Sequence, residues 1–105
     1  MSCTTVSYTI KSECQYEHTR LIEAIFTELQ STEPVNIDYR VIRSADELTY
    51  THSSTSNGLD GKNPITDLAS FIAFTENLSE RVIKPPVVDN SELIGNYRSD
   101  QPAIH

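Results

Sequence analysis

The stretch NIDYRVIRSADELTYTH, residues 36–52, decides the fold because it predicts two short strands joined by a tight polar turn. Apolar and polar residues alternate along residues 36–43, where Ile42 is the one exception, and again along residues 48–53. A period of two is typical of a strand with one dry face. Between the two runs lie Ser44 and Asp46, whose side chains bond nearby backbone groups in turns. We therefore predict a β-hairpin.

The predicted hairpin has a drier face and a polar face. The drier face carries Ile37, Tyr39, Val41, Leu48, Tyr50 and His52. The polar face carries Asn36, Asp38, Arg40, Thr49 and Thr51. A covered tyrosine needs a partner for its hydroxyl group. The drier face is therefore either core, with the tyrosine hydroxyls at its rim, or the wall of a pocket.

The flanking segments extend this hairpin to a complete small domain. Residues 3–11 predict a first strand, with Val6, Tyr8 and Ile10 on its drier side. Residues 15–30 predict a helix with an apolar stripe. Residues 65–81 predict a second helix, and Lys84-Pro85-Pro86 is expected to end it. A last strand is expected at residues 87–88 and 93–97, with an interruption at residues 89–91.

The resulting order, strand–helix–strand–strand–helix–strand, is the ferredoxin-like plan. We expect an α+β fold with a βαββαβ order and a four-stranded antiparallel sheet. The 105 residues suffice for one domain over residues 1–105, with its core at about residues 5–97. The tail, residues 98–105, is expected to be frayed or docked on a partner.

Residues 53–64, SSTSNGLDGKNP, predict a flexible loop because they contain two of the three glycines and Pro64. One interpretation is a mobile surface loop. The other is a lid over a pocket that begins at His52, since long loops beside a site are often functional. The residues alone leave both interpretations open.

Composition excludes several classes of function. The net charge of −7 argues against a nucleic-acid partner, which requires a basic surface. No apolar run approaches the ~20 residues of a membrane span, and the first residues lack the pattern of a signal peptide; we expect a cytoplasmic protein without a membrane partner. Cys3 and Cys14 are expected to be free thiols. Cys14 and His18 are four residues apart, but without a clear third ligand we predict no metal site.

A sheet with both helices on one side leaves its other side uncovered. Such a face can bind RNA, be solvated, or pack on a second copy of the chain in an isologous dimer. The acidic charge and the lack of a basic aromatic motif argue against RNA.

Several residues resemble the antibiotic biosynthesis monooxygenase-like family of the dimeric α+β barrel superfamily. Glu33-Pro34, Asn36-Ile37, Tyr39, Val41 and Arg43-Ser44 are similar to that family's EPG-(N/C)-L-x-Y-x-V-x-R stretch. The strand at residues 48–51, the Phe71-x-x-Phe74 pair and Pro85-Pro86-Val87 agree in order and spacing, so the resemblance covers about residues 5–97.

The resemblance implies a homodimer, joined sheet to sheet into a barrel with a small-molecule pocket in each half. Similar proteins are cofactor-independent monooxygenases of phenolic or quinol substrates, or degrade haem; others have no known activity. Here Val35 replaces the usual Gly, and Thr51-His52 stands where an acidic residue and Trp are usual. The Asn–Trp–His set of the haem degraders is absent, which excludes haem degradation.

Two hypotheses of function follow from the resemblance. The first is a cofactor-independent monooxygenase that acts on a small phenolic or quinol substrate. His52 would be its base because of its pKa, Tyr50 a second catalytic residue, and Asn36, Tyr39 and Tyr8 would bind the substrate. The alternative is a non-catalytic dimer that binds a small aromatic ligand or another protein. In that case His52 is a histidine at the end of a strand whose hydrogen bonds are satisfied within the protein.

Overall fold

The computed structural model describes residues 2–56, 64–95 and 97, and it confirms the ferredoxin-like α+β fold. The sheet has the order β2-β3-β1-β4, and all its pairings are antiparallel. The elements along the chain are the strand β1 (Ser2–Ile10), the 3₁₀ helix η1 (Ser12–Cys14), the helix α1 (Gln15–Thr32), the strands β2 (Ile37–Arg43) and β3 (Thr49–Ser56), the 3₁₀ helix η2 (Pro64–Asp67), the helices α2 (Ala69–Glu76) and α3 (Leu78–Arg81), and the strand β4 (Val82–Glu92).

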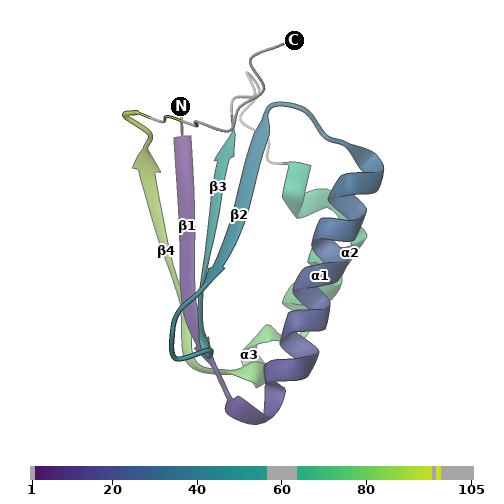
Figure 1. Ribbon diagram of the computed structural model, residues 1–105, viewed down its shortest axis with the longest axis vertical. Helices are drawn as coiled ribbons and strands as arrows, with labels where there is room; N and C mark the ends of the chain where they lie inside the picture. The colour runs from purple at the N-terminus through teal and green to yellow at the C-terminus, as the bar shows by residue number, and fades with distance from the viewer. Residues whose placement is uncertain (1, 57–63, 96, 98–105) are drawn as a thin grey trace.

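The helices lie on one side of the sheet, as Figure 1 shows. The core forms between these two layers. Its buried members are Tyr8, Ile10, Ile22, Ile25, Tyr50, Ile65, Leu68 and Phe74. The drier face predicted for the hairpin is the face that the helices cover. No helix among the described residues is long and apolar enough to cross a membrane.

The register of the sheet sets the side chains of the covered face beside one another. His52 of β3 pairs with Val6 of β1 on one side and with Val41 of β2 on the other. Residues two positions along a neighbouring strand share the same face and lie diagonally across from the paired residue. Tyr8 and Tyr39 are therefore the diagonal neighbours of His52.

Three predicted boundaries are corrected by the structure. Residues 53–56 belong to β3 instead of to a loop, because they pair with both neighbouring strands; the rest of the predicted lid, residues 57–63, lies outside the described residues, as does the tail, residues 98–105. The single helix predicted at residues 65–81 is divided into η2, α2 and α3. Leu93 and Ile94 follow β4 and are not part of it.

The strand β4 runs without a break through Pro85 and Pro86, where the sequence predicted only an ending. Proline is tolerated in a strand at the edge of a sheet or at an irregularity in the pairing. Both conditions hold here, since β4 is an edge strand and its register with β1 shifts between Ser7 and Thr9.

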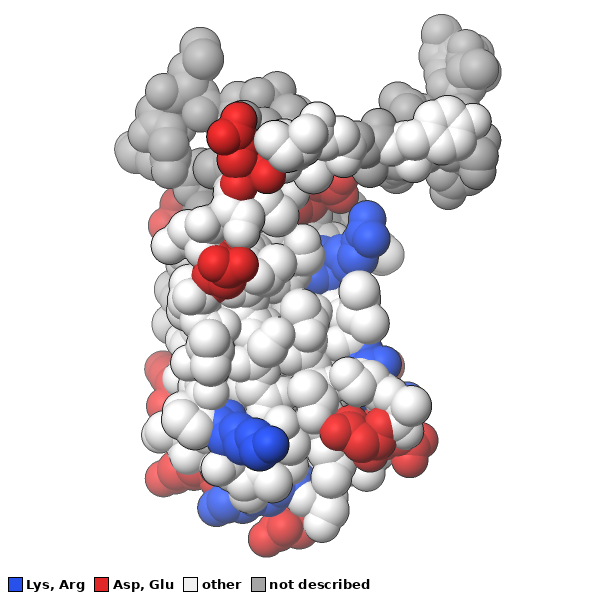
Figure 2. Space-filling model, turned by 90° about the vertical axis from the view of Figure 1, so that its left-hand side faces the viewer, with Lys and Arg blue, Asp and Glu red and all other residues white. Residues whose placement is uncertain are grey.

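The sheet face opposite the helices, here called the open face, carries small polar side chains in rows across the strands. Ser7 and Thr51 share a hydroxyl contact of 3.0 Å, and so do Thr9 and Thr49. Figure 2 shows this side of the molecule, where uncharged side chains cover the middle and most charged side chains lie toward the margins.

Candidate functional site

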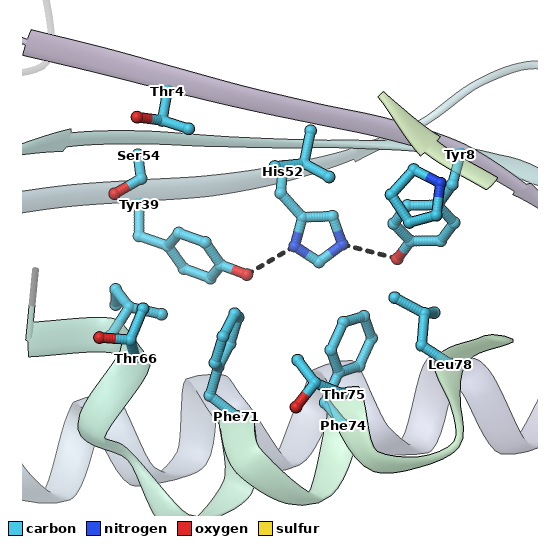
Figure 3. A pocket seen from close by; sticks show the side chains of 13 residues that line it. Thr4, Tyr8, Tyr39, His52, Ser54, Thr66, Phe71, Phe74, Thr75 and Leu78 are labelled. Carbon is cyan, nitrogen blue, oxygen red and sulfur yellow. Dashed lines mark hydrogen bonds between the residues drawn. The ribbon is translucent and has the colours of Figure 1, made fainter. Parts of the chain in front are cut away.

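A cavity of about 210 Å³ lies between the covered face of the sheet and α2. None of the described residues that line it is charged. Aromatic and aliphatic side chains form most of the wall, and Figure 3 shows Phe71 and Phe74 of α2 opposite the strands. The lining residues are Thr4, Val6, Tyr8, Tyr39, His52, Ser54, Ile65, Thr66, Phe71, Phe74, Thr75, Leu78 and Pro86.

Three polar side chains form a hydrogen-bonded row along the sheet wall of the cavity (Figure 3). The hydroxyl oxygen of Tyr39 lies 2.6 Å from Nδ1 of His52, and Nε2 of His52 lies 2.6 Å from the hydroxyl oxygen of Tyr8. The three residues come from β2, β3 and β1, and the diagonal register described above brings them together. Both nitrogens of the His52 ring are therefore occupied by tyrosines.

The row continues behind the cavity wall into the interior. The Tyr8 hydroxyl also lies 2.7 Å from Nε2 of His18, and Nε of Arg81 donates a hydrogen bond of 3.1 Å to Nδ1 of His18. A second nitrogen of Arg81 donates to the backbone oxygen of Phe74 at 2.6 Å. His18 is 0 % exposed, Arg81 4 % and His52 6 %. We call Arg81, His18, Tyr8, His52 and Tyr39 the polar chain.

Burial keeps the titratable members of the polar chain neutral at neutral pH. It lowers the pKa of His52 to about 4. Burial, followed by the positive charges of Arg81 and His52, lowers the pKa of His18 to about 4. Burial also raises the pKa of Tyr8 and of Tyr39 well above the usual value of 10.0. Arg81, which cannot lose its proton in a protein, is therefore the one charged member.

Of the residues proposed from the sequence, Tyr8, Tyr39 and His52 meet at the cavity and the other two do not. Tyr50 stacks on Tyr8 with ring centroids 5.8 Å apart, but it does not line the cavity, and its hydroxyl lies 3.4 Å from that of Thr19. Asn36 is exposed in the turn before β2 with a φ of 63°. Asn adopts this left-handed conformation more readily than most residues, which explains its presence without a substrate.

The hydrogen bonds of His52 bear on its proposed role as a general base. A general base requires a ring nitrogen that can receive a proton from the substrate. Here neither nitrogen faces the cavity without a partner, so a substrate proton could reach His52 only through a tyrosine.

Sequence reasoning missed His18 and Arg81 as members of the site. His18 was considered only as a metal ligand with Cys14, but both its nitrogens are engaged by the polar chain. The described residues contain no group of three or more His, Cys, Asp or Glu placed to hold a metal ion. A usable signal was present, since His18 lies four residues before Ile22 on the apolar stripe of α1.

No protein-family model matches the chain, and no curated protein matches it significantly. Solved structures do. A protein of Nitrosomonas europaea described as "Putative antibiotic biosynthesis monooxygenase" is 11% identical, with a TM-score of 0.75 over 90% of this chain and 100% of that one. Another antibiotic biosynthesis monooxygenase gives a TM-score of 0.73 at 11% identity, with the same coverage.

Rv0793 from Mycobacterium tuberculosis gives a TM-score of 0.71 at 12% identity and covers 92% of this chain and 98% of that one. At such low identity the likeness establishes the fold alone. The resemblance seen in the sequence is thereby confirmed for the architecture: the chain has the fold of the antibiotic biosynthesis monooxygenase-like proteins.

Proposed function

We propose that this protein is a cofactor-independent monooxygenase that acts on a small phenolic or quinol substrate in the cavity. The observation that carries the proposal is the row Tyr39–His52–Tyr8 on the wall of a mostly apolar cavity. Small-molecule sites are typically apolar with a few convergent polar groups. Tyr39 is the group that meets the substrate oxygen, and His52 orients Tyr39.

The size and lining of the cavity suit a single substituted aromatic ring. An apolar protein cavity of about 150 Å³ holds benzene, and this cavity has about 210 Å³. Phe71 and Phe74, which are tilted by 30° with centroids 6.0 Å apart, offer ring faces and edges for aromatic contacts.

The proposed reaction balances without an external reductant. A phenol with a free para carbon and one O₂ give a quinone and one water: one oxygen atom enters the ring, and the substrate supplies the two electron pairs that reduce O₂. Ionisation of the phenol, with release of its proton to solvent, starts the reaction because the anion gives an electron to O₂ more readily. The protein therefore needs to hold the substrate and stabilise its anion.

We also propose that two copies associate through their open faces. Ile42 and Val87 are 51% and 69% exposed and lie in one row across the open face, together with Ser7 and Thr51. A surface whose middle is uncharged and partly apolar can pack closely on its own copy in an isologous dimer.

A second function is a non-catalytic dimer that binds a small aromatic ligand or another protein. The same cavity supports it, because an apolar pocket with hydrogen-bonding groups binds ligands whether or not a reaction follows.

Oxygen consumption separates the two functions. We expect the protein to consume O₂ with members of a panel of phenols that have a free para carbon, without added metal or flavin, and to form one quinone for each O₂ consumed. Tyr39→Phe should reduce turnover, whereas Tyr16→Phe, at an exposed site on α1, should not. Binding of panel members without oxygen consumption would favour the non-catalytic function.

Light scattering tests the dimer. Thr51→Arg places a charge in the middle of the open face and should shift a dimer toward monomer. The matched change Thr27→Arg on the exposed side of α1 should leave the mass unchanged. A wild-type monomer at all concentrations would refute association through the open face.

A further inference from the structure

We infer that Arg81 fixes the direction of every hydrogen bond in the polar chain, so that Tyr39 presents a hydrogen-bond donor to the cavity and the cavity selects ligands by an anionic oxygen, such as a phenolate. The substrate class rests on the proposed function; the direction of the chain does not. Arg81 and His52 are then positioning residues, and Tyr39 is the residue that touches the ligand.

The direction follows from the donors and acceptors one step at a time. Arginine has donors only, so Nδ1 of His18 must be the acceptor in the contact of 3.1 Å. A neutral His18 then carries its hydrogen on Nε2 and donates it to the Tyr8 oxygen at 2.7 Å. The single hydroxyl hydrogen of Tyr8 is left to bond Nε2 of His52 at 2.6 Å.

The last two steps reach the cavity. With Nε2 as an acceptor, the neutral His52 carries its hydrogen on Nδ1 and donates it to the Tyr39 oxygen at 2.6 Å. The Tyr39 hydroxyl hydrogen has no acceptor among the described residues and is free to point into the cavity that Tyr39 lines.

The opposite direction is excluded by Arg81. If Tyr39 donated to His52, each later bond would reverse, and His18 would carry a hydrogen on Nδ1, facing the N–H of Arg81. Two buried donors would then meet at 3.1 Å without an acceptor, which is costly. Protonation of His18 would create the same conflict.

The positive charge of Arg81 is a second reason why the cavity should favour a ligand with an anionic oxygen. The described residues give the buried Arg81 no carboxylate partner, since its side chain donates to the Phe74 carbonyl and to His18. In the polar chain, every hydrogen atom that forms a hydrogen bond points away from the Arg81 guanidinium and toward the cavity. Hydrogen bonds in such a chain polarise one another, so the Tyr39 hydroxyl should bind an anion more strongly than an isolated tyrosine would.

Nitrogen NMR of the ligand-free protein tests the direction without any ligand or turnover. We expect His18 to be the Nε2–H tautomer and His52 the Nδ1–H tautomer at neutral pH. The reverse tautomer at His52 would overturn the inference, whether or not the protein consumes O₂. Absence of turnover with these tautomers present would instead count against the proposed function.

The selection for an anion is tested with 4-nitrophenol, whose absorbance reports its ionisation. We expect the bound ligand to ionise at a pH lower than the free ligand by about one unit or more, which corresponds to about tenfold tighter binding of the phenolate. Among the described residues on the lining, Tyr8, Tyr39 and His52 are the ones that titrate, and His18 and Arg81 stand behind them.

Variants link this preference to the polar chain. Tyr39→Phe should abolish the shift in ionisation, and Arg81→Met should reduce it, while Arg81→Lys, which retains a cation and a donor, should restore part of it. Arg20→Met, at an exposed site on α1, is the matched control. Equal affinity for phenol and phenolate in the wild type would overturn the selection.

Discussion

Tyr8 is the side chain on which the buried polar groups depend most, because its one hydroxyl oxygen bonds both histidines. Tyr8→Phe would leave Nε2 of His18 and Nε2 of His52 buried without that partner. We expect a loss of unfolding free energy on the order of 3 kcal/mol, measured by urea denaturation.

The control for this change is Tyr16→Phe. The Tyr16 hydroxyl is exposed and bonds only Arg20 among the described residues, so its removal should change stability by no more than about 0.5 kcal/mol. Equal effects of the two changes would contradict a structural dependence on Tyr8.

His52 offers a second prediction for a single residue. A glutamine can donate through its amide nitrogen to Tyr39 and accept through its oxygen from Tyr8, but it cannot serve as a base. We therefore expect His52→Gln to retain a substantial part of the 4-nitrophenol ionisation shift, and His52→Ala to lose it. If the glutamine variant behaves as the alanine variant does, His52 acts by more than hydrogen-bond direction.

The site could be predicted in part, residue by residue. Tyr8, Tyr39 and His52 were identifiable because strand alternation places them on one face. The Arg81–His18 segment was not, since it joins residues 63 positions apart through packing of α1 against the end of α3. Periodicity within one element carries no information about such a contact.

At the scale of the elements, a side chain of α1 stabilises the N-terminus of α2. Glu28 accepts hydrogen bonds from the backbone N–H of Ser70 at 2.8 Å and from its hydroxyl at 2.6 Å, and these bonds lower the pKa of Glu28. A carboxylate near a helix N-terminus is stabilising. We expect Glu28→Gln to lower the melting temperature by a few degrees.

Glu23→Gln is the matched control, because Glu23 is exposed on the same helix. Its melting temperature should equal that of the wild type within error. A melting temperature of Glu28→Gln that matches this control would show that the contact with Ser70 does not stabilise α2.

The order of the elements was predictable, whereas several of their ends were not. Alternation and the apolar stripe gave β1, α1, β2 and β3 to within a few residues. The strand β4 was misjudged because Pro85 and Pro86 signal an ending by local rules, while its place at the edge of the sheet removes the penalty.

Stability of the whole molecule should fall with acid because two neutral histidines are buried. Both pKa values are lowered from 6.5 to about 4 in the folded protein. Between these values the unfolded chain binds protons that the folded protein does not, so a falling pH favours unfolding across this window. We expect a decrease on the order of several kcal/mol in total, measured as urea midpoints at a series of pH values.

Between pH 6.5 and 4.5, the two carboxylates whose pKa is lowered in the folded protein do not obscure this effect. The pKa values of Glu28 and Asp46 are lowered from 4.5 and 3.8, so their contribution is lost only as the pH falls below those values. A constant urea midpoint from pH 6.5 to 4.5 would contradict neutral burial of His18 and His52.

The two prolines of β4 also restrict how the molecule can polymerise. Successive backbone N–H groups of a strand point to opposite sides, so consecutive prolines remove one donor toward β1 and one toward solvent. A foreign strand that approached β4 would find its hydrogen-bond template interrupted at this point. The β4 edge of the sheet is thereby guarded against the edge-to-edge stacking that builds cross-β fibrils, while the open face stays available for another copy.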